Sequence, residues 1–352
     1  MARLSARGLP VIFAMLLAAC TAPAQPLPGD RPGQTPAGQP RDELGALSMS
    51  KRQAGTALAP IPAPIKAEPV RAAPLPGDRP GQTPAGQQAG TVNRPVQLWP
   101  FTKFRGVDHV AVREIGKRYG LKAAWTKPGA VMTLNDARGV RFTFERDERD
   151  FRLDGARVFL GGPAYLSGND LWVTKVDVIK TIAPLFAPAD HAALLPAAPK
   201  VIVLDPGHGG TDPGKQNLRL KLDEKDMTLD VAMRLKKLLE LRGYRVVMTR
   251  TTDTRFSNNP IVDLPLRAEV ANKAEADLFL SIHFNAVDRD PQRVSGVETY
   301  VLAPQGQAST QPEQDRIMIT TQYPGNRQDT ANALLGYSLH RQLVTALKSS
   351  DR

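Results

Sequence analysis

The stretch VIVLDPGHGGTDPGK, Val201–Lys215, decides the fold of the second half of this chain. Its first four residues are apolar and mostly β-branched, which predicts a buried strand that ends abruptly at Asp-Pro-Gly. His208 follows at once, and the glycines that flank it permit tight turns and a close approach of the backbone to a ligand. We therefore expect His208 to lie at the carboxyl end of a strand and to have a functional role.

The residues after this stretch alternate between predicted helices and strands. Asp223–Leu241 carries apolar residues on one helical face and is followed by Gly243, a residue typical of helix ends. Further strands are predicted at 245–250, 277–283 and 296–302, and further helices at 266–274 and 330–350. This order predicts an α/β domain over residues 199–352, built around a mostly parallel sheet flanked by helices.

Two of the predicted strands end in histidine. In open α/β sheets functional groups gather beyond the carboxyl ends of the strands, so His208 and His283 should share one edge of the sheet. Glu224, at the start of a helix, would point towards the same edge. An acidic residue also suits the first helical turn through the helix dipole, but the two histidines favour a metal ligand. Two histidines and one carboxylate form the ligand set of a catalytic zinc site, with a fourth position left for water.

The segments VIVLDPGHGGTDPG, DEKDMTLDVAMRLKKLLELRGYRVVMTR, LPLRAEVANKAEADLFLSIHFNA and GVETYVL occur here in this order. Together they closely resemble the zinc-dependent N-acetylmuramoyl-L-alanine amidases of bacterial cell walls, from about Lys200 to the chain end. The resemblance implies Zn²⁺ ligands at His208, Glu224 and His283. It suggests Arg267 and Asn285 as substrate-binding candidates, although structural support would explain both equally well. The implied reaction is hydrolysis, by zinc-activated water, of the amide between N-acetylmuramic acid and the L-alanine of the stem peptide.

The resemblance also implies a second glutamate, on a strand that follows the long C-terminal helix. No position before Arg352 matches it, so we expect a domain truncated at its C-terminus and little amidase activity from the 352-residue chain. Glu298 is a weaker catalytic candidate, because it belongs to the GVETY segment and suits a structural or substrate-facing role. A missing strand would also expose a sheet edge. Two alternatives remain: a zinc-dependent cell-wall peptidase, and a non-catalytic wall-binding lipoprotein.

Residues 1–20 resemble a lipoprotein-type signal peptide. Arg3 and Arg7 precede an apolar run that is too short to span a membrane and fits an export signal. The run ends in Leu-Ala-Ala-Cys, and Cys20, the only cysteine of the chain, is the expected lipidation site. Ordinary cleavage after Ala24 is the alternative. We expect a periplasmic protein anchored to the membrane through lipid, with peptidoglycan as its partner. Nucleic acid is not an expected partner for an exported chain, and an activator protein is possible but not identified by the sequence.

Between the signal and the α/β domain the sequence predicts three regions. Residues 21–95 form a Pro/Gly-rich disordered tether, in which PLPGDRPGQTPAGQ occurs at Pro26–Gln39 and again at Pro74–Gln87. Residues 96–187 predict a small α+β module that resembles a stalk module of cell-wall proteins, and 188–198 a linker. Val107, Val110, Ile115 and Leu121 fall at near-helical spacing in this module. Of the net charge of +11, residues 199–352 contribute only 21 − 19 = +2, so +9 belongs to the front of the chain.

Overall fold

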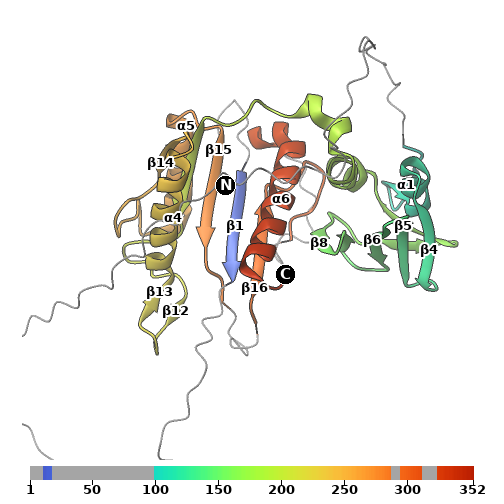
Figure 1. Cartoon of the computed structure of the whole chain (residues 1–352), viewed down its shortest axis with the longest axis horizontal. Coiled ribbons are helices and arrows are strands. Elements are labelled where there is room, and N and C mark those ends of the chain that lie inside the picture. The colour runs from blue at the N-terminus through green and yellow to red at the C-terminus, as the bar shows by residue number, and fades with distance from the viewer. Residues whose placement is uncertain (1–10, 18–98, 287–293, 311–322) are drawn as a thin grey trace, which may run out of the picture. The chain divides into compact units, whose positions relative to one another are not determined.

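The computed structural model describes residues 11–17, 99–286, 294–310 and 323–352, which belong to one compact unit (Figure 1). Cys20, the duplicated motif and the predicted tether lie outside these residues. The expectations about lipidation and disorder therefore remain predictions.

The second half of the chain contributes four strands to a five-stranded sheet with the order β14-β11-β15-β1-β16. Strand β11 runs parallel to both β14 and β15, and β15 runs parallel to β1, whereas β16 is antiparallel to β1 (Figure 1). The strands are β1 (Val11–Leu17), β11 (Val201–Pro206), β14 (Arg245–Met248), β15 (Leu278–His283) and β16 (Gly296–Val301).

Strand β11 is buried on both faces. Ile202 and Leu204 cluster with Leu235 and Leu239 of helix α4 (Glu224–Glu240). Val203, which points to the opposite face, clusters instead with Ala271 of helix α5 (Pro260–Lys273). Alternate side chains of a strand point to opposite faces, so the continuous apolar run is what a strand between two helical layers requires.

Helix α6 (Asp329–Leu347) packs against β16. A Cβ atom on Gly336 would lie only 2.5 Å from Cγ1 of Val301, so this glycine sets how closely helix and strand approach. The hairpin β12 (Gln216–Asn217) and β13 (Leu222–Asp223) precedes α4, and the 3₁₀ turn η4 (Pro324–Gln328) precedes α6.

Strand β1 lies inside the segment that the sequence predicts to be an export signal. Its backbone fills the place between β15 and β16, which do not pair with each other. The register aligns Met15 with His283 on one side and with Glu298 on the other. A short apolar run suits either use, because the hydrophobic region of a signal and a buried strand have the same kind of composition, but cleavage before Cys20 would remove β1 from the mature protein.

The expectation of a mostly parallel sheet concerned residues 199–352, and three of the four strand pairs in the sheet of this region are parallel. Antiparallel pairs predominate among the described residues, because the sheets of the module and the β12–β13 hairpin contain no other kind. The protein is a mixed α/β structure in which the parallel pairs surround β11 and β15.

The module before residue 188 contains two antiparallel sheets, with orders β2-β3-β10-β9 and β4-β5-β6-β7-β8. Their strands are β2 (Thr102–Phe104), β3 (Val107–Ala111), β4 (Lys122–Lys127), β5 (Val131–Asp136), β6 (Gly139–Glu145), β7 (Asp150–Leu153), β8 (Ala156–Phe159), β9 (Tyr165–Ser167) and β10 (Asp170–Thr174). The helical elements of the module are α1 (Val112–Tyr119), α2 (Lys175–Asp177), η1 (Val178–Ile182) and α3 (Ala183–Phe186), and η2 (Pro188–Leu194) follows in the predicted linker.

The near-helical spacing from Val107 gives way to a strand and then a helix. Residues up to Ala111 form β3, and α1 begins only at Val112. Gly120 ends the helix in the left-handed conformation, with a φ of 66°. Val110 belongs to β3 because it pairs with Val173 of β10, and Val107 because it pairs with Phe104 of β2.

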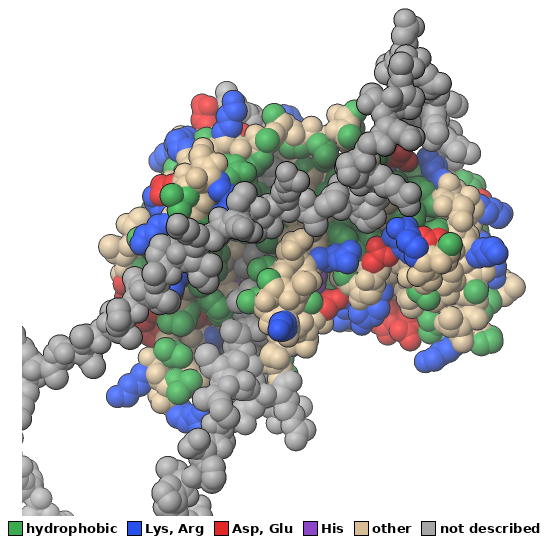
Figure 2. All heavy atoms as spheres, viewed as in Figure 1, with side chains coloured by type: hydrophobic (Ala, Val, Ile, Leu, Met, Phe, Trp, Pro, Cys, Tyr) green, Lys and Arg blue, Asp and Glu red, His purple; other side chains and the backbone are tan. Residues whose placement is uncertain are grey.

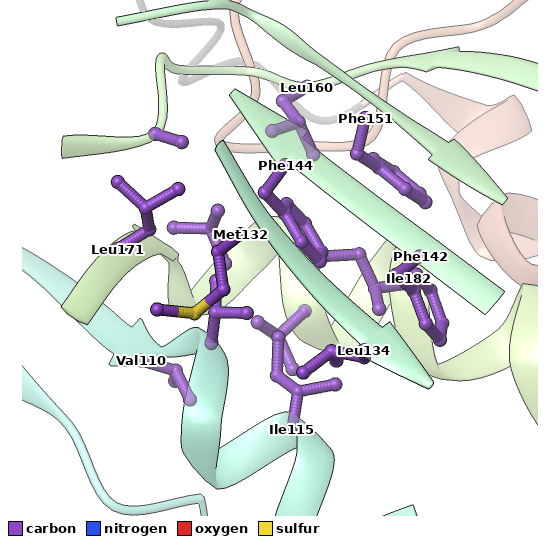
Figure 3. Close-up of a cluster of buried hydrophobic side chains, with 14 of the residues drawn as sticks. Val110, Ile115, Met132, Leu134, Phe142, Phe144, Phe151, Leu160, Leu171 and Ile182 are labelled. Carbon is purple, nitrogen blue, oxygen red and sulfur yellow. The ribbon is translucent and has the colours of Figure 1, made fainter. Parts of the chain in front are cut away.

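The module has the largest hydrophobic core of the described residues (Figure 3). Phe142 and Phe144 alternate along β6 and stack with ring centroids 5.9 Å apart, and Phe151 of β7 packs against both. Tyr337 of α6 packs against this core and donates a hydrogen bond of 2.8 Å to the carbonyl of Leu153. Helix α6 thus connects the module to the sheet that carries the histidines.

A buried carboxylate adds to this connection. Asp177 Oδ1 accepts hydrogen bonds of 2.7 Å from the Gly161 amide and from Nε2 of Gln307. Burial raises the pKa of Asp177 to about 6, although hydrogen bonds from Gly161 and Thr174 oppose the shift. The module and the segment after β16 therefore share a buried polar contact at Asp177.

Surface charge is mixed in sign. On the face shown in Figure 2, basic and acidic side chains are interspersed over the described residues. None of the helices in the described part of the chain combines the length and the apolar character that a membrane crossing requires.

Candidate metal centre

The three residues expected to bind metal meet at the carboxyl ends of β11 and β15. His208 Nε2 lies 3.2 Å from His283 Nδ1 and 3.0 Å from Glu224 Oε1, and the distance from His283 Nδ1 to Glu224 Oε1 is 3.1 Å. His208 and His283 are partly exposed, whereas the Glu224 side chain is only 3% exposed. Among the described residues, this is the only such group of three or more potential ligands.

The spacing of the three donor atoms fits a zinc ion. Zinc bonds of about 2.0–2.1 Å at tetrahedral angles place neighbouring ligand atoms about 3.3 Å apart. The three observed separations of 3.0–3.2 Å are close to that value. Two nitrogens and one carboxylate oxygen also match the preference of zinc. The residues present therefore fit the metal that the sequence implies.

The backbone around His208 is held in an uncommon conformation. His208 has a φ of 61°, in the left-handed region, and Gly209 and Gly210 follow with φ values of 128° and 56°. A non-glycine residue in this region persists only when its surroundings enforce it. The quoted stretch thus turns sharply at its histidine, as its glycines predict.

Two buried arginines enforce this turn. Arg250, just after β14, donates to the carbonyls of Pro206 and Gly207 at 3.0 and 2.8 Å. Arg267 of α5 donates to the carbonyls of Pro206 and His208 at 3.0 and 2.9 Å. Three successive carbonyls are therefore occupied by charged donors, which make stronger hydrogen bonds than neutral ones.

Glu224 is held by backbone amides as well as by the histidines. Its Oε2 accepts from the Lys215 amide at 2.9 Å, and its Oε1 from the Phe284 amide at 2.8 Å. Burial acts to raise its pKa, but hydrogen bonds from His208, His283 and these amides outweigh burial and hold the pKa well below its usual range. Glu224 is therefore ionised and oriented, as a metal ligand must be.

Asp212 orients His208 from the side opposite the ligand atoms. Its Oδ2 lies 3.0 Å from His208 Nδ1, and its Oδ1 accepts from the Gly214 amide at 3.1 Å. Carboxylates in this position fix the tautomer and orientation of ligating histidines. Burial lowers the pKa of His208, but hydrogen bonds with Glu224 and Asp212 outweigh it and raise the pKa.

Two glycines are required by close contacts rather than by conformation alone. A Cβ atom on Gly207 would lie 2.3 Å from Cε1 of His283, and one on Gly214 would lie 2.6 Å from Cδ2 of His208 and 2.7 Å from Oε2 of Glu224. The glycines of the quoted stretch thus give the ligand side chains the space in which they converge.

The other predicted site residues occupy different places. The Arg267 side chain is only 6% exposed and bonds to Asp205 and Asp263 as well as to the turn, which is a supporting role. Asn285 donates to Glu298 Oε2 at 3.4 Å, and Glu298 also accepts from the Tyr300 hydroxyl at 3.0 Å. Glu298 lies two strands from His283 along the register, about 10 Å at normal strand spacing. Its contacts lie with Asn285, Tyr300 and Arg352 rather than with the three ligand atoms.

Sequence reasoning missed two members of this site. Asp212 lies within the quoted stretch, but an aspartate among glycines is equally typical of a turn. Arg250 is the last residue of the predicted strand 245–250, and no role was expected for it. The available signal was the position of Arg250 at the end of a strand whose neighbour in the sheet ends at the 206–208 turn.

Comparison with known proteins identifies this region. Residues 202–352 match the family model of N-acetylmuramoyl-L-alanine amidases. The germination-specific N-acetylmuramoyl-L-alanine amidase of Bacillus subtilis is 41% identical over 114 residues, which are 30% of this chain and 46% of that protein. The amidase AmiC of Escherichia coli O6:H1 is 42% identical over 114 residues, which are 32% of this chain and 25% of that protein.

A solved structure shows the same similarity in sequence. The amidase AmiC2 of Nostoc punctiforme is 40% identical over 26% of this chain and 47% of that chain, with a TM-score of 0.23, too low to bear on the fold. The chain spans less than half the length of each of these three relatives.

Proposed function

We propose that the protein, whose residues 202–352 form a domain of the N-acetylmuramoyl-L-alanine amidase family, is a zinc-dependent peptidoglycan hydrolase. Its substrate would be the amide between N-acetylmuramic acid and the L-alanine of the stem peptide. The observation that carries this proposal is the convergence of His208, Glu224 and His283 within the segment that matches the family.

The chain's own residues prepare the site for hydrolysis. His208 Nε2, His283 Nδ1 and Glu224 Oε1 would hold the metal, and Asp212 would keep the proton of His208 on Nδ1. When bound, zinc supplies a Lewis acid that lowers the pKa of water to about 7 and polarises a carbonyl group. The amides that hold Glu224 and the arginines that hold the 206–208 turn keep the ligands in place, so little reorganisation is needed during the reaction.

Proton transfer to the leaving amine needs a further group. Glu298 is the carboxylate that the sequence suggests. It lies level with His283 in the sheet, because both residues are register partners of Met15. Strand β1 lies between β15 and β16, which places the backbones of His283 and Glu298 about 10 Å apart. Glu298 would therefore act on the leaving amine through water or through the bound substrate. Its contacts with Asn285 and Tyr300 favour a role in orienting the strand-end loop.

The test is the identity of the products. Zinc-loaded protein is incubated with a muramoyl-L-alanyl peptide, and the mixture is analysed by mass spectrometry. A free lactyl carboxylate on muramic acid together with an intact stem peptide identifies an amidase. Cleavage inside the peptide identifies a peptidase instead, and binding without any cleavage identifies a wall-binding protein. His283→Ala serves as the metal-site control and Glu298→Gln tests the second carboxylate.

We also propose export and lipid anchoring at Cys20. The support is the basic residues and apolar run of the signal and the Leu-Ala-Ala-Cys sequence that ends it. Mass spectrometry of the mature N-terminus tests this: a lipidated Cys20 supports it, and an unmodified chain that begins at Gln25 refutes it.

A further inference from the structure

A small cavity adjoins the metal centre without being part of it. It is lined by three arginines, Arg250, Arg255 and Arg267, and by Thr249, Thr254 and Phe256. Its volume is about 60 Å³. Since about 10–15 Å³ of such space holds one water, the cavity is large enough for a group the size of a carboxylate.

Arg255 is the member of this cavity that lacks full hydrogen bonding. Its side chain is only 9% exposed, and its Nε is buried without a hydrogen-bond partner among the described residues. The nearest carboxylate oxygens of Asp263 and Asp212 lie 3.7 and 3.8 Å from its nitrogens. These distances are too long for hydrogen bonds. A buried donor without a partner is costly, so this nitrogen indicates a missing ligand.

Both neighbouring carboxylates are already committed to other donors. Asp263 Oδ1 accepts from the Phe256 and Ser257 amides, and its Oδ2 from Arg267 Nε at 2.7 Å. Asp212 contacts His208 through Oδ2 and the Gly214 amide through Oδ1. Neither can turn towards Arg255 without releasing a group that shapes the metal centre.

Arg250 brings a positive charge to the cavity without a carboxylate bonded to it, whereas Arg267 is paired with Asp205 and Asp263. Arg250 donates to the carbonyls of Pro206, Gly207, Lys225 and Thr252 and to the Thr228 hydroxyl, and no carboxylate is among these acceptors. Burial, followed by repulsion from Arg267, lowers the pKa of Arg250. An anion in the cavity would offset this repulsion and complete the hydrogen bonding of Arg255.

We propose that this cavity binds a carboxylate of the substrate's stem peptide, with the Arg255 guanidinium group as the principal donor. The cavity itself indicates that the ligand is an anion. The identification of this anion with the stem peptide rests on the proposed amidase function. Asp212 contacts both His208 and Arg255, so the carboxylate site lies one side chain from the metal centre. The site would therefore favour stem peptides with a free acidic group near the scissile amide.

The test uses the peptide product, so that binding is measured whether or not the chain turns over substrate. Calorimetry compares an L-alanyl-D-glutamyl peptide with its free α-carboxylate and the same peptide with that group amidated, on the zinc-loaded full chain. Wild type should bind the free acid on the order of tenfold more tightly. Arg255→Gln should bind both peptides alike, and Arg255→Lys should retain part of the preference. The exposed Arg242→Gln is the matched control and should behave as wild type.

Several results would overturn the proposal. Equal affinity of wild type for both peptides excludes a carboxylate site even if Arg255→Gln does not fold. A preference retained by folded Arg255→Gln excludes Arg255 as the donor. If acetate or inorganic phosphate raises the unfolding temperature of wild type while neither peptide binds, the cavity takes a free anion and the assignment to the stem peptide is wrong. A preference for the free acid in a chain that releases no amidase product would instead count against the proposed function alone.

Discussion

Asp212 Oδ2 lies 3.0 Å from Nδ1 of His208, on the side of the imidazole opposite the atom that faces Glu224 and His283. The metal-binding nitrogen is therefore selected by a contact outside the ligand set. Asp212→Ala should weaken zinc binding by about 10–100-fold, the usual effect of losing such a partner. Competition with a chelator measures this, with Asp230→Ala on the exposed face of α4 as the control. Unchanged zinc affinity would show that His208 is oriented by the turn alone.

Gly207→Ala should remove the metal site and leave the fold in place. The added Cβ would lie 2.3 Å from His283 Cε1, so the imidazole must move away from the other two ligands. Gly243→Ala is the matched control, because its φ is 87° but nothing lies within 4 Å of the new atom. It should cost about 1–2 kcal/mol through backbone strain and keep its zinc. Zinc bound equally by both variants would contradict the crowding argument.

Asp177 should make the protein less stable as the pH rises from about 4 to about 6. Its folded-state pKa is raised from 3.8 to about 6 by burial, so between these values the folded chain binds the proton more tightly than the unfolded chain. The stability that protonation provides is complete below the unfolded-state pKa and is lost as the pH passes the folded-state pKa. Each unit of difference is worth about 1.4 kcal/mol.

Urea unfolding across this pH range measures the effect. Asp177→Asn should gain stability relative to wild type as the pH increases, because the amide has no proton to lose. The nearby charged group, Arg149, opposes the shift and stays charged throughout. Parallel stability profiles for the two proteins would show that the carboxylate of Asp177 is ionised at all these pH values.

Removal of residues 1–20 should destabilise the sheet. Strand β1 separates β15 from β16, so a chain that begins at Thr21 leaves the paired edges of both without a partner. We expect a lower unfolding midpoint in urea and a tendency to associate through the open edge. Removal of residues 1–10 alone is the control, and it should change neither the unfolding midpoint nor the tendency to associate. Identical midpoints for the full and shortened chains would show that the sheet does not depend on β1.

Much of the candidate site could be predicted from sequence, for a specific physical reason. The carboxyl ends of parallel strands meet at one edge, so histidines after two such strands predict a shared location for His208 and His283. Glu224 followed from its place at a helix start. Asp212 and Arg250 were missed because a turn aspartate and a strand-end arginine each have a more common explanation.

The fold was less predictable where the chain pairs over long distances. Val110 has helical spacing but lies in β3, because it pairs with Val173 of β10 some 60 residues later. The place of residues 11–17 beside β15 was not predictable either. Their composition indicates burial but does not say against which partner.

Zinc stoichiometry tests the central claim most directly, because the account depends on His208, Glu224 and His283 acting as one ligand set. Purified full-length protein is saturated with zinc, dialysed and subjected to elemental analysis beside His283→Ala and a His191→Ala control, whose imidazole lies in η2 away from this group. We predict one zinc per chain for wild type and the control, and loss of most of it in His283→Ala. Zinc content that is unaffected by His283→Ala would contradict the assignment of this site.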